Sequence, residues 1–299
     1  MPAPVLFVLS GLTQYAGAAL AVGLFVQVAA PTVAWLRIAV SAVVLLAWRR
    51  PWRARWTGRS LGTAALFGVV LAAMNVSFYL AIDVLPLGTA VAIEFLGPVA
   101  VAAITGRGWR ERLGILVAGL GVVALAGVQR GTGEDPRVLH GLVAIGAAAV
   151  FWAGYIMLGR RVAVGAARAG GREGPGSGSA QVRPAPDGLA SLAVGMVAGA
   201  LVGAPFLAAG ATPVLHDPAL AAAVLGIAVL SSVVPYAIEQ VVLRRVSAAS
   251  FAVLLALLPA TATAVGAVAL RQWPHGWEVL GLACVSAAIV LTSRPGMRR

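Results

Sequence analysis

Two charged side chains lie deep inside apolar stretches, and they are the residues best placed to do chemistry. Glu94 lies in GTAVAIEFLGPVAVA (88–102), and Arg37 lies in AWLRIAV. An ionised group at the centre of a bilayer costs about 2.5–3.5 kcal/mol on insertion scales, so such residues are rare and usually functional. In helices that cross in the same direction, a rise of about 1.5 Å per residue places both at similar depth. They are predicted either to form an ion pair or to face each other across one polar cavity.

Three prolines inside apolar stretches are expected to break the helices that contain them, and the first of them lies four residues after Glu94. Pro98 has no N–H, so the carbonyl oxygen of Glu94 loses its helical donor and is free to face a ligand or water. Pro235 and Pro259 do the same for the carbonyl four residues before each of them. Broken helices at matching positions in two halves indicate a transport site, and packing kinks are the alternative.

Polar and aromatic side chains recur at helical spacing in three further apolar segments. Asn75 and Tyr79 are four residues apart, and Trp152 and Tyr155 are three apart, so each pair shares one helix face. A third set is spaced by four and consists of Ser232, Tyr236 and Gln240. These side chains are predicted to line a substrate cavity. The alternatives are hydrogen bonds between helices and aromatic anchors at the membrane interface.

The elements that must position these residues are membrane-spanning helices. The 299 residues are 60% hydrophobic and 11% charged, whereas a soluble domain has about 25% charged residues. A helix of roughly 20 apolar residues spans a bilayer. Ten such windows lie near 5–27, 31–48, 61–83, 86–105, 113–129, 140–158, 189–209, 219–241, 248–270 and 277–293. The prediction is an all-α integral membrane protein with ten transmembrane helices.

The charge pattern predicts how the chain is oriented. All 22 basic residues are arginines, and they lie between apolar windows rather than in one patch, so the net charge of +12 does not indicate nucleic-acid binding. Eighteen lie in the loops and tail of one side, against three in the loops of the other side. Because arginine-rich loops remain in the cytoplasm, a bacterial cytoplasmic (inner) membrane with both termini on the cytoplasmic side is expected.

A weak internal repeat relates the two halves. Residues 85–107 resemble residues 246–268, with small residues around a central proline, and Pro98 and Pro259 are 161 positions apart. These prolines fall in the fourth and ninth windows. Because each half contains five spans, an odd number, the second half must run in the opposite direction. The sequence therefore predicts two inverted-topology five-helix repeats, an architecture that exposes one midplane site alternately to either side.

The expected domains follow from this repeat. Residues 1–130 form the first five-helix repeat, and residues 139–293 form the second. The stretch 159–188, within the second repeat, is rich in Gly, Ala, Pro and Arg and is predicted to be a flexible cytoplasmic linker.

The sequence contains no pattern that indicates catalysis or a cofactor. The three histidines lie at predicted outer span ends, without Cys, Asp or Glu at metal-ligand spacing. Lysine is absent, so there is no nucleotide-binding G-x-x-x-x-G-K-[ST] loop, and no H-E-x-x-H pattern occurs. We expect no enzyme activity, no metal and no cofactor, and an energy source other than ATP.

Two long runs carry a family resemblance. MNVSFYLAIDVLPLGTAVAIEFLGPVAVA (74–102) and VLSSVVPYAIEQVVLRRVSAASFAVLLALLPA (229–260) resemble the threonine/homoserine exporter branch of the EamA-type drug/metabolite transporters. AWLRIAV and FWAGYIML extend the resemblance over nearly the whole chain. The resemblance implies ten helices in two inverted halves. It also implies export of small amino acids across the cytoplasmic membrane, driven by the proton gradient.

The chain departs from the pattern of similar exporters at two places. They carry glutamate immediately before the proline of the ninth span, where this chain has Leu258. They carry Gly-Glu near the start of the tenth span, where this chain has Arg271 and Gln272. Because the acidic residues of the second half are missing, Glu94 is expected to perform any proton coupling alone.

The function expected from these observations is secondary-active export of a small neutral amino acid or related metabolite. Glu94 would hold a proton and the substrate ammonium in turn, and Arg37 would anchor the substrate carboxylate or neutralise Glu94. The side chains expected to shape the cavity are Asn75, Tyr79, Tyr236, Gln240, Trp152 and Tyr155. The expected partners are the substrate, protons, the lipid bilayer and a second copy of the chain in a homodimer, with no nucleic acid.

Two other functions remain open at this point. Efflux of lipophilic cationic drugs is the alternative transport function, since Glu94 with aromatic walls would also accept a cation. A membrane scaffold or sensor that transports nothing is the alternative from a different class. In that case Glu94 and Arg37 would form only a structural pair.

Overall fold

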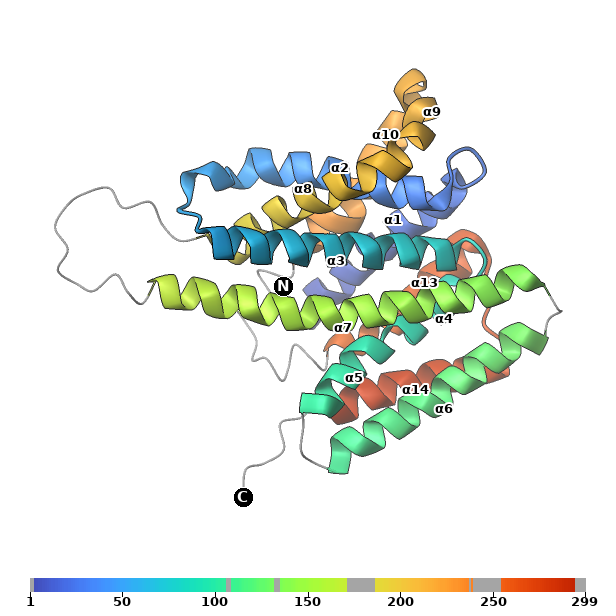
Figure 1. Ribbon diagram of the computed structural model, residues 1–299. Coiled ribbons are helices and arrows are strands. Elements are labelled where there is room, and N and C mark those ends of the chain that lie inside the picture. The colour runs from blue at the N-terminus through green and yellow to red at the C-terminus, as the bar shows by residue number, and fades with distance from the viewer. Residues whose placement is uncertain are drawn as a thin grey trace.

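The computed structural model describes residues 3–105, 109–131, 135–170, 186–236, 238 and 254–293, and every regular element within them is a helix (Figure 1). Seven helical stretches are long and apolar enough to cross a membrane, and three shorter apolar helices accompany them at Arg112–Leu125, Leu257–Leu270 and Gly276–Thr292. Each of the ten predicted windows overlaps one of these stretches. The prediction of an all-helical membrane protein is confirmed.

The helices of the first half are α1 (Ala3–Leu24), α2 (Ala30–Arg49), α3 (Gly58–Ile82), α4 (Leu87–Glu94), α5 (Leu96–Thr105) and α6 (Trp109–Gly131). The main helices of the second half are α7 (Pro136–Gly170), α8 (Gly188–Leu207), α10 (Pro218–Ala228), α13 (Leu257–Leu270) and α14 (Gly276–Ser293). The shorter segments are η1 (Pro51–Arg53), η2 (Ala208–Ala211), α9 (Thr212–His216) and the π-helical η3 (Val229–Val233).

Local sequence signals set several helix starts. α3 begins with a capping box, in which the Thr57 side chain accepts from the Ser60 N–H and the Ser60 side chain accepts from the Thr57 N–H. The Asp187 carboxylate caps α8 by accepting from the N–H of Ala190, and Asp217 caps α10, which starts with Pro218.

The fourth span consists of two helices. α4 ends at Glu94, Phe95 forms a turn, and α5 begins at Leu96, two residues before Pro98. In the second half, Ala256 forms a turn and α13 begins at Leu257, two residues before Pro259. The two turns are therefore separated by the same offset as the two prolines.

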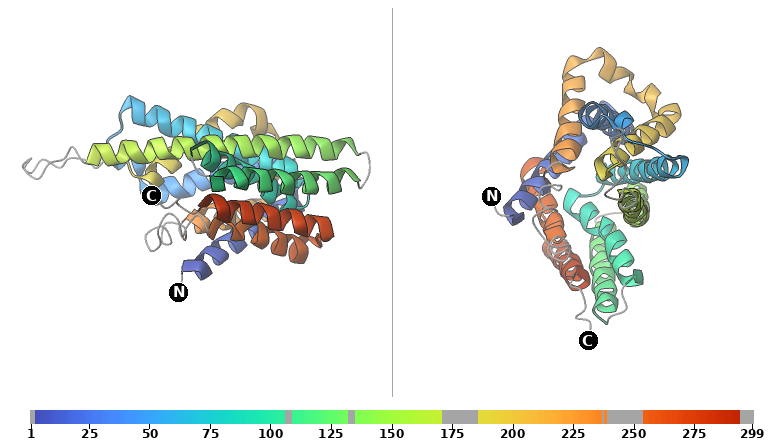
Figure 2. Two further views of the ribbon diagram at one scale, coloured as in Figure 1. Left: turned by 90° about the horizontal axis from the view of Figure 1, so that it is seen from below. Right: turned by 90° about the vertical axis from the view of Figure 1, so that its left-hand side faces the viewer.

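α4 lies at the centre of the bundle. All eight of its residues are buried, and it contacts α3, α7, α13 and α14. Figures 1 and 2 show α7 running along the length of the bundle and α6 beside α14. The larger apolar cluster surrounds α4, and a smaller one lies among α2, α3 and α8.

The helix contacts of one half have counterparts in the other. α1 packs on α13, and α7 packs on α4 and α5. α3 packs on α7 and α8, whereas α10 packs on α1 and α2. If a twofold rotation exchanges the two halves, each contact between two helices has an equivalent contact between the corresponding helices of the other half. The contact of α1 with α13 then corresponds to that of α7 with α4 and α5. The inverted orientation of the repeats and their boundaries remain predictions.

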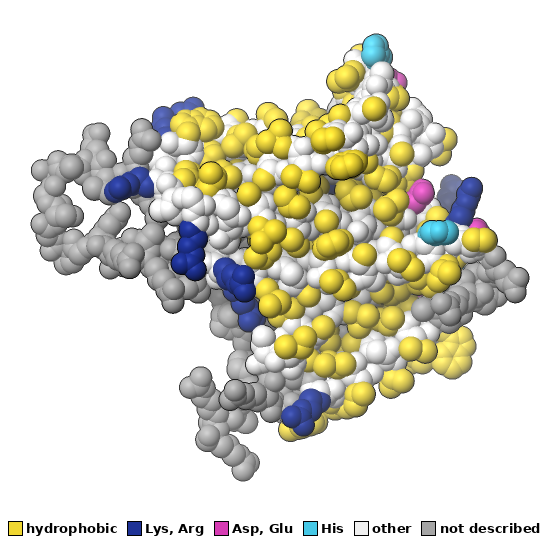
Figure 3. Space-filling view, in the orientation of Figure 1, with side chains coloured by type: hydrophobic (Ala, Val, Ile, Leu, Met, Phe, Trp, Pro, Cys, Tyr) yellow, Lys and Arg dark blue, Asp and Glu magenta, His cyan; other side chains and the backbone are white. Residues whose placement is uncertain are grey.

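The two ends of the bundle differ in charge. Most of the arginine side chains visible in Figure 3 gather at the left-hand end, and the visible histidines lie on the right. This is the distribution expected if the arginine-rich end faces the cytoplasm. The sidedness of the termini remains a prediction.

The predicted linker 159–188 begins as helix. α7 continues to Gly170, beyond the end of its predicted window, so residues 159–170 are helical rather than irregular. A linker prediction based on composition missed this extension because Ala and Arg favour helix and no proline interrupts the stretch. Residues 171–185 of the predicted linker lie outside the described part of the chain.

Candidate functional site

Glu94 is the last residue of α4 and lies at the break in the fourth span. It is buried, with 9% of its surface exposed. Within the described part of the chain, no group donates a hydrogen bond to its carboxylate and no ion pair engages it. A buried carboxylate without a protein partner can accept a proton or bind a cationic group, because either neutralises it.

Arg37 of α2 is held by the eighth span. Its Nη2 donates to the carbonyl oxygen of Ser231 at 2.9 Å, and its Nε donates to the Ser232 hydroxyl at 3.1 Å. The carbonyl of Ser231 is the one that Pro235 deprives of its helical donor. The guanidinium also lies 3.5 Å from the Tyr79 hydroxyl and 5.7 Å from the centre of that ring. Arg37 therefore joins the first half to the π-helical segment η3 of the second.

The predicted ion pair between Glu94 and Arg37 is absent from the contacts of the described residues. The hydrogen bonds from all three nitrogens of Arg37 to η3 and Tyr79 fix the direction in which the guanidinium points, and none of them leads to Glu94. Arg37 is nevertheless near enough for its charge to attract the Glu94 carboxylate. The alternative expectation, that the two charges face each other across one polar cavity, stays a prediction.

Replacing Arg37 with Lys is expected to lower the free energy of unfolding by about 1–3 kcal/mol. Lysine keeps the charge but cannot reproduce the forked contact to Ser231 and Ser232, and an unsatisfied buried acceptor costs about that much. The thermal unfolding midpoint of detergent-purified protein measures the effect. Arg161→Lys on the exposed part of α7 is the control and should change nothing, whereas equal midpoints for both variants would show that the network is dispensable.

The two polar residues of α3 differ in their contacts. Tyr79 is fully buried and takes part in the Arg37 network. Asn75 is buried, but its Nδ2 donates to the carbonyl of Leu71 in the same helix at 2.8 Å. Asn75 therefore keeps its amide oxygen and one N–H of its amide nitrogen for another partner.

The aromatic residues of α7 pack against other rings. Trp152 meets Phe95 edge to face at 4.6 Å between centroids, directly at the α4–α5 break. Tyr155 stacks on Phe67 of α3 at 4.5 Å. A Cβ on Gly97 would overlap the backbone of α7 at Ala149, so glycine permits this close approach. Trp152 thus contacts the residue that follows Glu94 in the sequence, and Tyr155 packs against the smaller apolar cluster.

The remaining candidates are the three prolines, Tyr236 and Gln240. Tyr236 packs against the smaller apolar cluster, Pro235 and Pro259 are buried, and Pro98 is half-buried. Gln240 lies outside the described residues. The structure tests the roles of none of these residues in binding.

Two contributions escaped the sequence analysis. Ser231 and Ser232 bind Arg37. Pro235 pointed to the free carbonyl of Ser231, and the spacing from Tyr236 pointed to Ser232, but neither signal identified Arg37 as the partner. Gln272 accepts a hydrogen bond from the Leu87 N–H at 2.9 Å and so caps α4, whereas the sequence analysis noted it only as a departure from the family pattern. Among the described residues, no group of three or more His, Cys, Asp or Glu could hold a metal ion.

The chain is similar to known transporters. A model of the EamA-like transporter family matches residues 179–294. The threonine/homoserine exporter RhtA of Salmonella typhimurium strain LT2 is 33% identical over 289 residues, covering 95% of this chain and 89% of the relative. RhtA of Escherichia coli strain K12 is 34% identical over 273 residues, covering 91% and 84%.

One solved crystal structure has a similar fold. It matches with a TM-score of 0.55 at 17% identity, covering 96% of this chain and 95% of the other. At this identity the similarity concerns the fold alone.

Proposed function

Because this chain belongs to the EamA-like transporter family, we propose that it exports threonine, homoserine or similar small neutral amino acids across the bacterial cytoplasmic membrane. The observation that carries the proposal is the similarity to threonine/homoserine exporters over 95% of the chain. The buried Glu94, at a break in a central helix, supplies the chemistry for it.

The proposed mechanism uses Glu94 as the coupling group. In one state its carboxylate binds the substrate ammonium, and in the other it holds a proton. Only one of the two can neutralise the buried charge at a time, so their flows are coupled in opposite directions. At the two positions where similar exporters carry glutamate in the second half, this chain has the neutral residues Leu258 and Gln272, so the mechanism assigns coupling to Glu94.

In this mechanism Arg37 has a positioning role as well as a charge. It holds η3 against α2 in the conformation described here. When the two halves move relative to each other during alternating access, this contact must rearrange. The released guanidinium could then contact the substrate carboxylate or Glu94, with the termini remaining in the cytoplasm throughout.

Transport by the purified native chain tests the proposed function. Proteoliposomes loaded with labelled threonine or homoserine should release them faster with a pH gradient than without one, and faster than protein-free liposomes. Release that is the same in all three conditions would contradict the proposal. Active efflux of a lipophilic cation without amino-acid transport would instead favour drug efflux, and no flux in a broad screen would favour a scaffold.

A further inference from the structure

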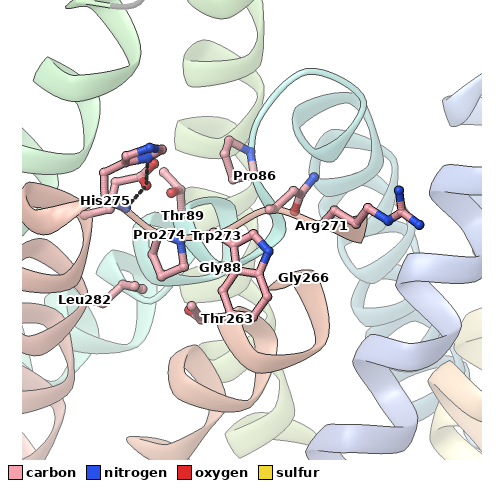
Figure 4. Close-up of a pocket in the computed structure, with 12 residues that line it drawn as sticks. Pro86, Gly88, Thr89, Thr263, Gly266, Arg271, Trp273, Pro274, His275 and Leu282 are labelled. Carbon is pink, nitrogen blue, oxygen red and sulfur yellow. Dashed lines mark hydrogen bonds and ion pairs between the residues drawn. The ribbon is translucent and has the colours of Figure 1, made fainter. Parts of the chain in front are cut away.

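A cavity with several polar side chains in its wall lies at the end of the bundle that is predicted to face outwards. Its volume is about 290 Å³, and it lies where α13 ends and α4 and α14 begin (Figure 4). Its polar lining includes Thr89, Gln272 and Glu278, and the Trp273 ring is part of its wall. Glu94 is not among its lining residues.

The N-terminus of α4 presents unpaired donors to this cavity. Its N-cap residue, Pro86, has no side chain that can cap, and its first turn contains no acidic residue. Gln272 Oε1 accepts from the Leu87 N–H, but among the described residues the N–H groups of Gly88 and Thr89 have no acceptor. No acidic residue within the first turn of α4 offsets the positive end of the helix dipole, and free N–H groups at a helix N-terminus favour an anionic group.

The Thr89 side chain independently indicates a ligand. It is 2% exposed and lines the cavity, yet its hydroxyl has no hydrogen-bond partner within the described residues. The Gln272 amide nitrogen likewise has no acceptor in that part of the chain. Both groups line one cavity. Polar groups in protein interiors are usually paired, so an almost fully buried hydroxyl and a half-buried amide that lack partners there are open to a ligand.

The cavity also contains a carboxylate. Glu278 is 6% exposed, and its Oε2 accepts from the backbone N–H of His275 at 2.9 Å and lies 3.6 Å from His275 Nδ1. In Figure 4 the guanidinium of Arg271 points away from His275 and Thr89. The cavity therefore combines neutral donors and a helix N-terminus with one buried anion.

We propose that this cavity is an outer binding site for a zwitterionic amino acid. The α-carboxylate binds the N–H groups at the start of α4, the Thr89 hydroxyl and the Gln272 amide, and the ammonium faces Glu278. The choice of an amino acid as the ligand rests on the proposed function. Thr89 and Glu94 are five residues apart, about 7.5 Å along α4, so the substrate would meet this site after leaving Glu94.

A cysteine reporter in the cavity tests the proposal. Thr263 lines the cavity, and its hydroxyl is already bonded to the Pro259 carbonyl, so Thr263→Cys places a thiol there without removing a proposed ligand. Cys284 is the single native cysteine and is changed to Ala. The rate of thiol modification by a small methanethiosulfonate is measured on the full chain in proteoliposomes. Threonine should slow the modification at least fivefold.

Analogues and variants identify the contacts. Because both charged groups are recognised, 3-hydroxybutyrate, which lacks the ammonium, and 1-amino-2-propanol, which lacks the carboxylate, should protect much less. Thr89→Val removes the hydroxyl at constant shape and should raise the half-protecting threonine concentration about tenfold, the effect of one hydrogen bond to a charged group. Thr105→Val, at the other end of the same span, is the matched control and should leave protection unchanged.

The outcomes separate this site from the proposed function. Protection that persists in Glu94→Gln supports a separate outer site, even if no net transport is found. Protection that disappears in Glu94→Gln but survives in Thr89→Val would overturn the proposal, because the effect would then arise at Glu94. The same conclusion follows if no neutral amino acid protects a chain that transports threonine.

Discussion

Replacing Glu94 with Gln is expected to reduce threonine transport driven by a pH gradient to the level of protein-free liposomes. Glutamine has the same shape but cannot release a proton or carry the charge that attracts an ammonium group. Losing one partner of a buried charge pair costs about 3–5 kcal/mol, so affinity should fall at least about 100-fold. The measurement is release of labelled threonine from proteoliposomes with and without the gradient.

The control is Asp83→Asn, which neutralises an exposed carboxylate at the end of α3 and should leave transport unchanged. Exchange of threonine across the membrane without a gradient separates the two roles of Glu94. If Glu94 binds only the proton, exchange persists in Glu94→Gln while gradient-driven flux is lost. A folded Glu94→Gln protein with native gradient-driven flux would eliminate Glu94 as the coupling group.

Replacing Gly68 with Ala is expected to lower the free energy of unfolding by about 3 kcal/mol, the upper end for overpacking. Gly68 of α3 contacts Gly195 of α8 so closely that an added Cβ would overlap the Gly195 backbone. The reciprocal approach is also tight, because a Cβ on Gly195 would lie 2.7 Å from the carbonyl oxygen of Ala64. Backbone atoms cannot rotate away, so the helices must separate.

The thermal unfolding midpoint of detergent-solubilised protein measures this effect. Gly62→Ala is the matched control, since Gly62 lies on the same helix and an added Cβ there would meet nothing within 4 Å. Without a clash, alanine in a helix is up to about 1 kcal/mol more favourable than glycine, so this variant should be as stable as the native chain or slightly more stable. Similar midpoints for both variants would mean that α3 and α8 pack less tightly than described.

The sequence alone was sufficient for the membrane class, for the approximate positions of ten helical spans and for the family. These properties depend on hydrophobicity over about 20 neighbouring residues and on motifs such as the one around Glu94. The importance of Glu94 and Arg37 was also predictable, because an ionisable residue inside an apolar span stands out without knowledge of its neighbours.

Only the tertiary structure determined the partners of these residues. Arg37 binds η3 rather than Glu94, Gln272 caps α4, and Thr89 lines a cavity between α4, α13 and α14. Each contact joins residues that are far apart in the sequence and depends on how neighbouring helices are rotated and shifted. In a membrane the lipid is as apolar as the protein interior, so hydrophobic patterning does not reveal which face of a helix is buried. That choice is made by close packing at residues such as Gly68 and by a few polar contacts between distant helices.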